Sequence, residues 1–288
     1  MLLDVYVWSF LFANTHADDK SNKFREASIT DDETAFKHSL GMRLLRLSPN
    51  LDSSDPLLLG IADCIDADAN GGRLLNSDLS DILLISNLNK IAGEKAAKNS
   101  DFCRAMGYLQ TALSLLPRDH WETHYRLSIE LHLALAQCVH ATSNLDLAKK
   151  SLEEIISHGR ELNDTLDAHF KLIFMTNLVK GKQGLALKSC VNILGQLGEH
   201  VDSSADNITN MVVSIRQTLN SRSDAELLNF KQLGASDSNS KRRLQFLSQA
   251  CLISSAGVEP NTNLYALCRS MEICLSEGYS QVRFIFEA

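Results

Sequence analysis

Residues that interrupt helices are scarce in this chain of 288 residues. It contains 4 prolines and 14 glycines, and aromatic residues make up only 6% of the sequence. β-Sandwiches and barrels need frequent turns built from glycine and proline, and their strands are rich in aromatic and β-branched residues. The composition therefore argues against an all-β fold and favours helices.

The chain also lacks a strong charge of either sign. Its formal net charge is −7, from 28 basic and 35 acidic residues. Proteins that bind nucleic acid or anionic membranes carry basic patches. The one basic cluster, at residues 241–243, is short, and we interpret it as the start of a solvated helix face. We therefore expect no nucleic-acid partner and no membrane partner.

Paired cysteines and long apolar runs are absent as well. None of the seven cysteines forms a Cys-x-x-Cys pair, so they predict neither a disulfide framework nor a zinc site. We interpret them as small apolar side chains in a reducing compartment, the cytoplasm. The apolar run at residues 5–13 is too short to cross a membrane. It leaves three alternatives open: a signal segment, a buried segment, or the incomplete start of a longer chain.

Apolar residues recur at helical spacing along most of the sequence. Glycine, proline and capping residues separate the predicted helices. The predicted helices span residues 33–47, 56–69, 78–98, 121–141, 164–180, 204–220, 222–231, 241–256 and 261–277, and further helices begin near residues 100, 143 and 181.

The helices that begin near residues 100, 143 and 181 start alike, with a small residue at an equivalent position. These residues are Ala105, Ala148 and Ala186, separated by 43 and 38 residues. Such a period, slightly longer than the ~34 residues of a tetratricopeptide repeat, predicts an all-α fold, an α-solenoid of antiparallel, tetratricopeptide-like helix pairs. The predicted structural positions of the repeats are Ala105, Leu109, Trp121, Tyr125, Ala148, Leu152, Ala186 and Gly198.

Changes in composition divide the chain into five predicted parts. They are a loosely ordered N-terminal segment at 1–32, a helical segment at 33–98, tetratricopeptide-like repeats at 99–232, a linker at 233–240, and a final helix pair at 241–288 that is expected to be truncated.

Several short segments resemble one protein family in their order and spacing. The segment LNKIAGEKA at 88–96 resembles the first repeat helix of the tetratricopeptide-like region that follows the AAA-type ATPase module in large predicted-ATPase signalling proteins. These proteins include Ser/Thr-kinase and hybrid histidine-kinase fusions. HSLGMRLL at 38–45 is similar to the helix after the ATPase core, and VNILGQLG at 191–198 is similar to the close of a later repeat. The resemblance covers residues 36–280.

The family's catalytic motifs are missing from this sequence. It has no Gly-x4-Gly-Lys-Ser/Thr loop to hold phosphates, and no His-Arg-Asp or Asp-Phe-Gly kinase motif. The resemblance therefore implies a helical region without ATPase or kinase activity. We predict that the chain is not an enzyme and has no catalytic residues and no cofactor.

Two short segments partly match known metal sites. His120 and His124 share one helix face, but the glutamate and third ligand of a zinc protease are missing, so we predict a helix start with Trp121 in the core. Residues 66–71 match the first half of a calcium loop, but the twelfth position is Ser77 instead of glutamate. There we predict the C-terminal turn of a helix, and no metal at either place.

The sequence thus predicts a non-catalytic helical-repeat module for protein–protein interaction or interdomain coupling in signal transduction. Its partner would be another protein or adjacent signalling domains. The alternative is a fragment of a larger ATPase or protein-kinase signalling protein whose catalytic domains are missing here. A metal-dependent enzyme using His120 and His124 is the third reading.

Overall fold

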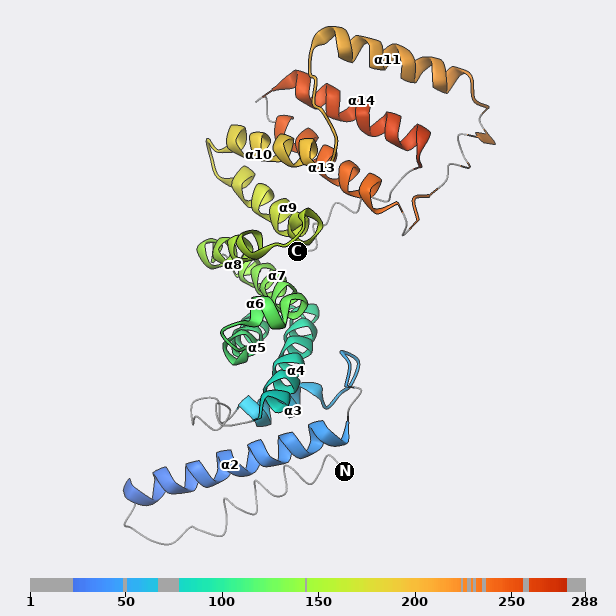
Figure 1. Ribbon diagram of the computed structural model, residues 1–288. Helices are drawn as coiled ribbons and strands as arrows, with labels where there is room; N and C mark the ends of the chain where they lie inside the picture. Colours follow the sequence, from blue (N-terminus) through green and yellow to red (C-terminus); the bar gives the residue numbers. More distant parts are fainter. Residues whose placement is uncertain are drawn as a thin grey trace. The chain divides into compact units, whose positions relative to one another are not determined.

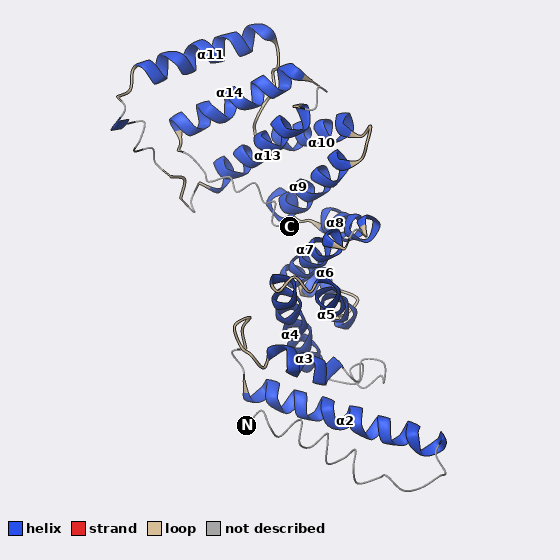
Figure 2. Ribbon diagram, turned by 180° about the vertical axis from the view of Figure 1, so that it is seen from behind, coloured by secondary structure: helices blue, strands red, loops and turns tan. Residues whose placement is uncertain are grey.

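The computed structural model describes residues 23–48, 51–66, 78–142, 144–223, 225–226, 229, 232–234, 237–255 and 259–278, with the backbone alone for 23–32. Within these ranges the regular structure consists of helices without a β-strand (Figures 1 and 2). The helices are α2 (Lys23–Leu47), α3 (Leu58–Asp66), α4 (Leu79–Lys98), α5 (Phe102–Leu115), α6 (His120–Thr123), α7 (Tyr125–Ala141), α8 (Leu145–His158), α9 (Leu162–Leu178), α10 (Gln183–Gln196), α11 (Ala205–Asn220), α13 (Ser238–Ser254) and α14 (Pro260–Ser276).

The chain divides into two compact units, Met1–Cys138 and Val139–Ala288. In the first unit, α2 packs on α3, α3 on α4 and α4 on α5. Helices α4 and α5 approach closely, since a β-carbon added to Gly93 would lie 2.7 Å from Leu109 Cγ and 3.2 Å from the carbonyl oxygen of Ala105. Small residues at this crossing therefore let the two helices pack at short range.

The second unit does not stack its helices in sequence order. Helices α8, α9 and α10 pack in succession, but α13 rather than α11 covers the other side of α10. Helix α14 packs on α13, and α11 lies against α14 (Figure 1). The core at the junction includes Phe246, whose ring meets that of Phe170 edge-on at 5.7 Å and whose carbonyl oxygen lies 3.2 Å from the Cys190 sulfur. This order differs from a simple linear repeat array.

Side chains cap the first turns of several helices. Asp101 accepts a hydrogen bond from the Arg104 amide at the start of α5, and Ser204 accepts one from the Asn207 amide at the start of α11. Asn144 does the same for α8. Such caps satisfy amide groups that have no partner inside the helix. The predicted all-α class is confirmed, and the predicted helices at 78–98 and 204–220 match α4 and α11 closely.

Other element bounds differ from the prediction. The stretch 121–141 is two helices, because the chain leaves helical geometry at His124 between α6 and α7. Helix α13 begins at Ser238, inside the predicted linker, and Leu233 at the start of that linker is buried. Helix α2 begins at Lys23, inside the segment predicted to be loose. The burial of Leu233 and the bond from Ser240 to Glu277 show that tertiary contacts order part of a linker that looks unstructured in isolation.

Some predictions fall outside the described residues. These are the apolar run at 5–13, the calcium-like turn after Asp66, half of the predicted helix 222–231, and the end of the chain after residue 278. Among the helices that the structure describes, none combines the length and apolar character that a membrane crossing requires.

Candidate functional site

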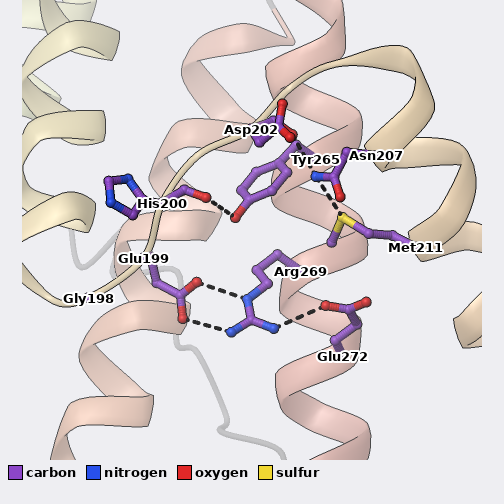
Figure 3. A pocket seen from close by; sticks show the side chains of 9 residues that line it. All are labelled: Gly198, Glu199, His200, Asp202, Asn207, Met211, Tyr265, Arg269 and Glu272. Carbon is purple, nitrogen blue, oxygen red and sulfur yellow. Dashed lines mark hydrogen bonds and ion pairs between the residues drawn. The ribbon is translucent and has the colours of Figure 1, made fainter.

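A hollow of about 420 Å³ opens on the second unit between the loop after α10, the first turns of α11, and α14 (Figure 3). It is lined by Gly198, Glu199, His200, Asp202, Asn207, Met211, Tyr265, Arg269 and Glu272. Most of these side chains are polar, and three are carboxylates.

The loop at the base of the hollow is shaped by the end of α10. Gly198 has a φ of +86°, its amide bonds the carbonyl oxygen of Gly195, and the next amide, that of Glu199, bonds the carbonyl oxygen of Leu194. This pair of bonds is the Schellman arrangement, which favours glycine because other residues rarely adopt a left-handed backbone. It turns the chain sharply, and Glu199 then points into the protein rather than into solvent.

Two arginines surround the carboxylate of Glu199, whose side chain is only 3% exposed. Arg269 on α14 donates from Nε to Oε2 at 2.8 Å and from Nη2 to Oε1 at 3.1 Å, and Arg243 on α13 donates from Nη1 to Oε1 at 2.7 Å. The arginines have second partners: Arg269 reaches Glu272 at 3.0 Å, and Arg243 reaches Glu277 at 2.8 Å. This network, the Glu199 network, joins the end of α10 to α13 and α14.

The network sets the protonation of its members. Burial by itself would raise the pKa of Glu199, but hydrogen bonds from Arg269 and Arg243 outweigh it, and the pKa falls below its ordinary value. The bond to Glu199 likewise raises the pKa of Arg269. Burial raises the pKa of Tyr265, and the Glu199 charge adds to that effect. At neutral pH the carboxylate and both guanidinium groups are therefore charged.

Hydrogen bonds hold the side chains of Tyr265 and Asn207, which line another part of the hollow. The Tyr265 hydroxyl donates to the carbonyl oxygen of His200 at 2.8 Å. The Asn207 amide donates to the carbonyl oxygen of Asp202 at 2.8 Å and lies 3.7 Å from the Met211 sulfur. Figure 3 shows these side chains around an open space, with the Arg269 guanidinium between Glu199 and Glu272.

The charge of the hollow is negative. Three carboxylates, on Glu199, Asp202 and Glu272, stand against the one guanidinium of Arg269, which leaves two negative charges on the lining. Adding Arg243 and its partner Glu277 does not change that balance. The arrangement suits a cationic group that donates hydrogen bonds, because unlike charges attract and carboxylate oxygens accept.

Helix α14 also carries an apolar stripe on its outer side. Leu264, Leu267 and Met271 are 49%, 52% and 46% exposed. Their spacing of i, i+3 and i+7 places them on one face, opposite the buried residues Thr262 and Ile273. These three residues are called the α14 stripe below. A helix that is apolar on both faces is normally covered on both.

The eight predicted structural positions are spread over several helices and do not form one site, and only some of them lie in the core. Five of them are fully buried: Ala105, Leu109, Ala148, Leu152 and Ala186. Trp121 and Tyr125 are half-buried, and their rings meet edge-on at 6.3 Å. Gly198 is exposed and forms the turn described above. Their equivalence as repeat positions stays a prediction.

The surroundings of His120 are those of a packed histidine. Its Nδ1 lies 2.7 Å from the Ser128 hydroxyl, and the Trp121 ring stacks on the His132 ring at 5.3 Å. Among the residues that the structure describes, no three His, Cys, Asp or Glu side chains are grouped closely enough to hold a metal ion. Of the cysteines, Cys138 and Cys190 are buried and Cys103 is exposed, so burial holds for only part of the set.

The sequence reasoning missed the Glu199 network. The expectation that residues 241–243 lie on a solvated face is wrong for Arg243, whose side chain is largely buried. Arg242 next to it pairs with Asp167 of α9 at 2.5 Å. The partners of these two arginines are 34 to 75 residues away in the sequence, and no local spacing links them. The only sequence signal was the pair of adjacent arginines near a helix start.

Comparison of the chain with family models, with curated proteins and with solved structures finds no match. The fold and the chemistry of the second unit are therefore the basis for an assignment of function.

Proposed function

We propose that this chain is a non-catalytic helical module that binds a protein partner or couples neighbouring domains, acting as a tetratricopeptide-like scaffold in signal transduction. The α14 stripe is the observation that carries the proposal. Three large apolar side chains in register on one exposed helix face lose water contact when a partner covers them, which stabilises a complex.

The chemistry of the hollow supports a binding role over a catalytic one. Two of its charged groups, the Glu199 carboxylate and the Arg269 guanidinium, are hydrogen-bonded to each other, which keeps both charged. A general base or nucleophile needs a pKa near the working pH and a side chain that can reach a substrate. Fixed, mutually neutralised groups serve better to hold loop, helix and partner in place.

The resemblance noted in the sequence suggests the kind of partner. In a large signalling protein, the module would contact an ATPase or kinase domain, either in the same polypeptide or in another one, and the cysteine content fits a cytoplasmic setting. If the chain is part of such a protein, in-frame sequence upstream of its gene will encode a phosphate-binding loop motif.

Capture of partners by stripe variants tests the proposal. The full chain and the variant L264Q/L267Q/M271Q are immobilised, and captured proteins are identified, purified and tested for direct binding. All three positions are exposed, so circular dichroism is expected to show the same helix content in both forms.

The matched control is L178Q/L185Q, which removes two exposed leucines from α9 and α10 of the same unit. We expect purified partners to bind the wild type and the control but not the stripe variant. If no purified candidate binds directly, or if stripe variant and control bind equally well, the proposal is wrong.

A further inference from the structure

The α14 stripe and the acidic hollow lie on adjoining sides of one helix. Met271 of the stripe is followed directly by Glu272 at the hollow, and Leu264 is followed by Tyr265. Successive residues of a helix are 100° apart, so Tyr265 and Glu272 lie on the face of α14 next to the stripe. The hollow therefore adjoins the stripe on that face. A partner on the stripe is thus placed beside the carboxylates.

Among the described residues of α14 that flank the stripe, charge is present on only one side. On the side of the stripe away from the hollow, α14 presents Asn263, Ser270 and Cys274, which are uncharged. On the near side, the lining of the hollow holds two net negative charges. A partner that fits both features needs an apolar face and positive charge along a single edge.

We propose that the stripe and the hollow together bind an amphipathic helix of a protein partner that carries lysine or arginine along one edge. Its apolar face packs on Leu264, Leu267 and Met271, and its basic side chains reach Glu272 and Asp202 at the mouth of the hollow. The helix-on-helix geometry follows the general mode in which an apolar helix face is covered by another. This inference rests on the proposed function, and it adds the chemistry of the partner.

The carboxylates at the mouth of the hollow can accept hydrogen bonds from a basic side chain of the partner. Arg269 cannot occupy the mouth, because two bonds to Glu199 and one to Glu272 hold its guanidinium back. Asp202 is exposed and uses Oδ1 to accept the Ser204 amide at 3.0 Å. A basic side chain can therefore add to these carboxylates without displacing a native bond.

Two stapled helical peptides of about 18 residues test the inference, long enough to present two to three turns to α14. They share one leucine face and differ only along one edge, which carries lysine in one peptide and glutamate in the other. Affinities for the full chain are measured by fluorescence anisotropy at low and high salt. We expect the lysine peptide to bind about tenfold more tightly at low salt, with the difference shrinking as salt screens the charges.

Variants separate the two features. We expect L267Q to weaken binding of both peptides, and D202N/E272Q to reduce the preference for lysine to about twofold. The control E153Q/E161Q removes two exposed carboxylates elsewhere in the same unit and is expected to keep the full preference.

Three results would overturn the inference. One is an absence of binding by the lysine peptide, and another is a preference that survives in D202N/E272Q. The third is dimerisation in sedimentation experiments that L267Q abolishes, since a second copy would then cover the stripe. The proposed function is tested separately: it would still hold if a purified partner binds the wild type but not L264Q/L267Q/M271Q.

Discussion

Replacing Glu199 by alanine tests whether the Glu199 network holds the second unit together. The carboxylate is almost completely buried and accepts three bonds from two guanidinium groups. Truncation leaves two partly buried cations facing an empty space. Removing one partner of a buried ion pair costs about 3–5 kcal/mol, because the other charge stays buried without compensation.

The surviving partners decide where in that range the cost falls. Arg243 keeps Glu277 at 2.8 Å and Arg269 keeps Glu272 at 3.0 Å, so neither arginine loses every partner. We therefore expect E199A to lower the free energy of unfolding of the second unit by about 3 kcal/mol at neutral pH. Urea titration followed by circular dichroism measures this value, and hydrogen exchange of α10, α13 and α14 locates it.

Acid should remove the difference between E199A and the wild type. Because the folded pKa of Glu199 lies below its ordinary value of 4.5, the carboxylate contributes stability above that pH and loses it as the pH falls through the folded pKa. The stability gap is then widest near neutral pH and narrows progressively below about pH 4.5.

The control is E153A on α8. Glu153 and Lys149 form a pair at 3.6 Å in which both side chains are more than half exposed, and such pairs contribute less than about 1 kcal/mol. If E199A destabilises no more than E153A, or if its effect does not depend on pH, the argument from the buried network is refuted.

Three further predictions concern other parts of the chain. Gly93→Ala, at the tight crossing of α4 and α5, should destabilise by about 1–3 kcal/mol, whereas Gly107→Ala, which meets open space in α5, should stabilise by about 0.5–1 kcal/mol; thermal melting compares them. Burial raises the pKa of Asp66 to about 6, so its protonated form contributes stability below about pH 4 that is lost as the pH rises through about 6. Asp66→Asn should therefore raise the melting temperature near pH 7.5 by the equivalent of roughly 1–2 kcal/mol and have little effect near pH 4, and equal effects at both pH values would contradict this. With a thiol reagent, Cys103 should react in the native protein and Cys190, whose pKa is raised by burial, only after denaturation; mass spectrometry of labelled peptides identifies each.

The local features of the fold could be predicted because they depend on neighbouring residues. Spacing of apolar residues and capping by Asp101, Asn144 and Ser204 define helix starts within one turn. The stacking order of the second unit could not be predicted. Whether α11 or α13 covers α10 depends on which faces fit, and both helices have an apolar face of suitable length.

The scarcity of proline, glycine and aromatic residues by itself determined that the chain is helical, since few positions can interrupt a helix. The spacing of apolar and small residues also placed Ala105 and Ala186 on buried faces, because burial follows from spacing along one helix. Only the tertiary structure decided the candidate site. The ion pairs of Glu199 join it to Arg243 and Arg269, which are 44 and 70 residues away in the sequence. The α14 stripe is exposed because the packing of the described helices leaves it uncovered. Ion pairs between distant residues and uncovered apolar surface both depend on how the helices pack, and no local sequence pattern encodes them.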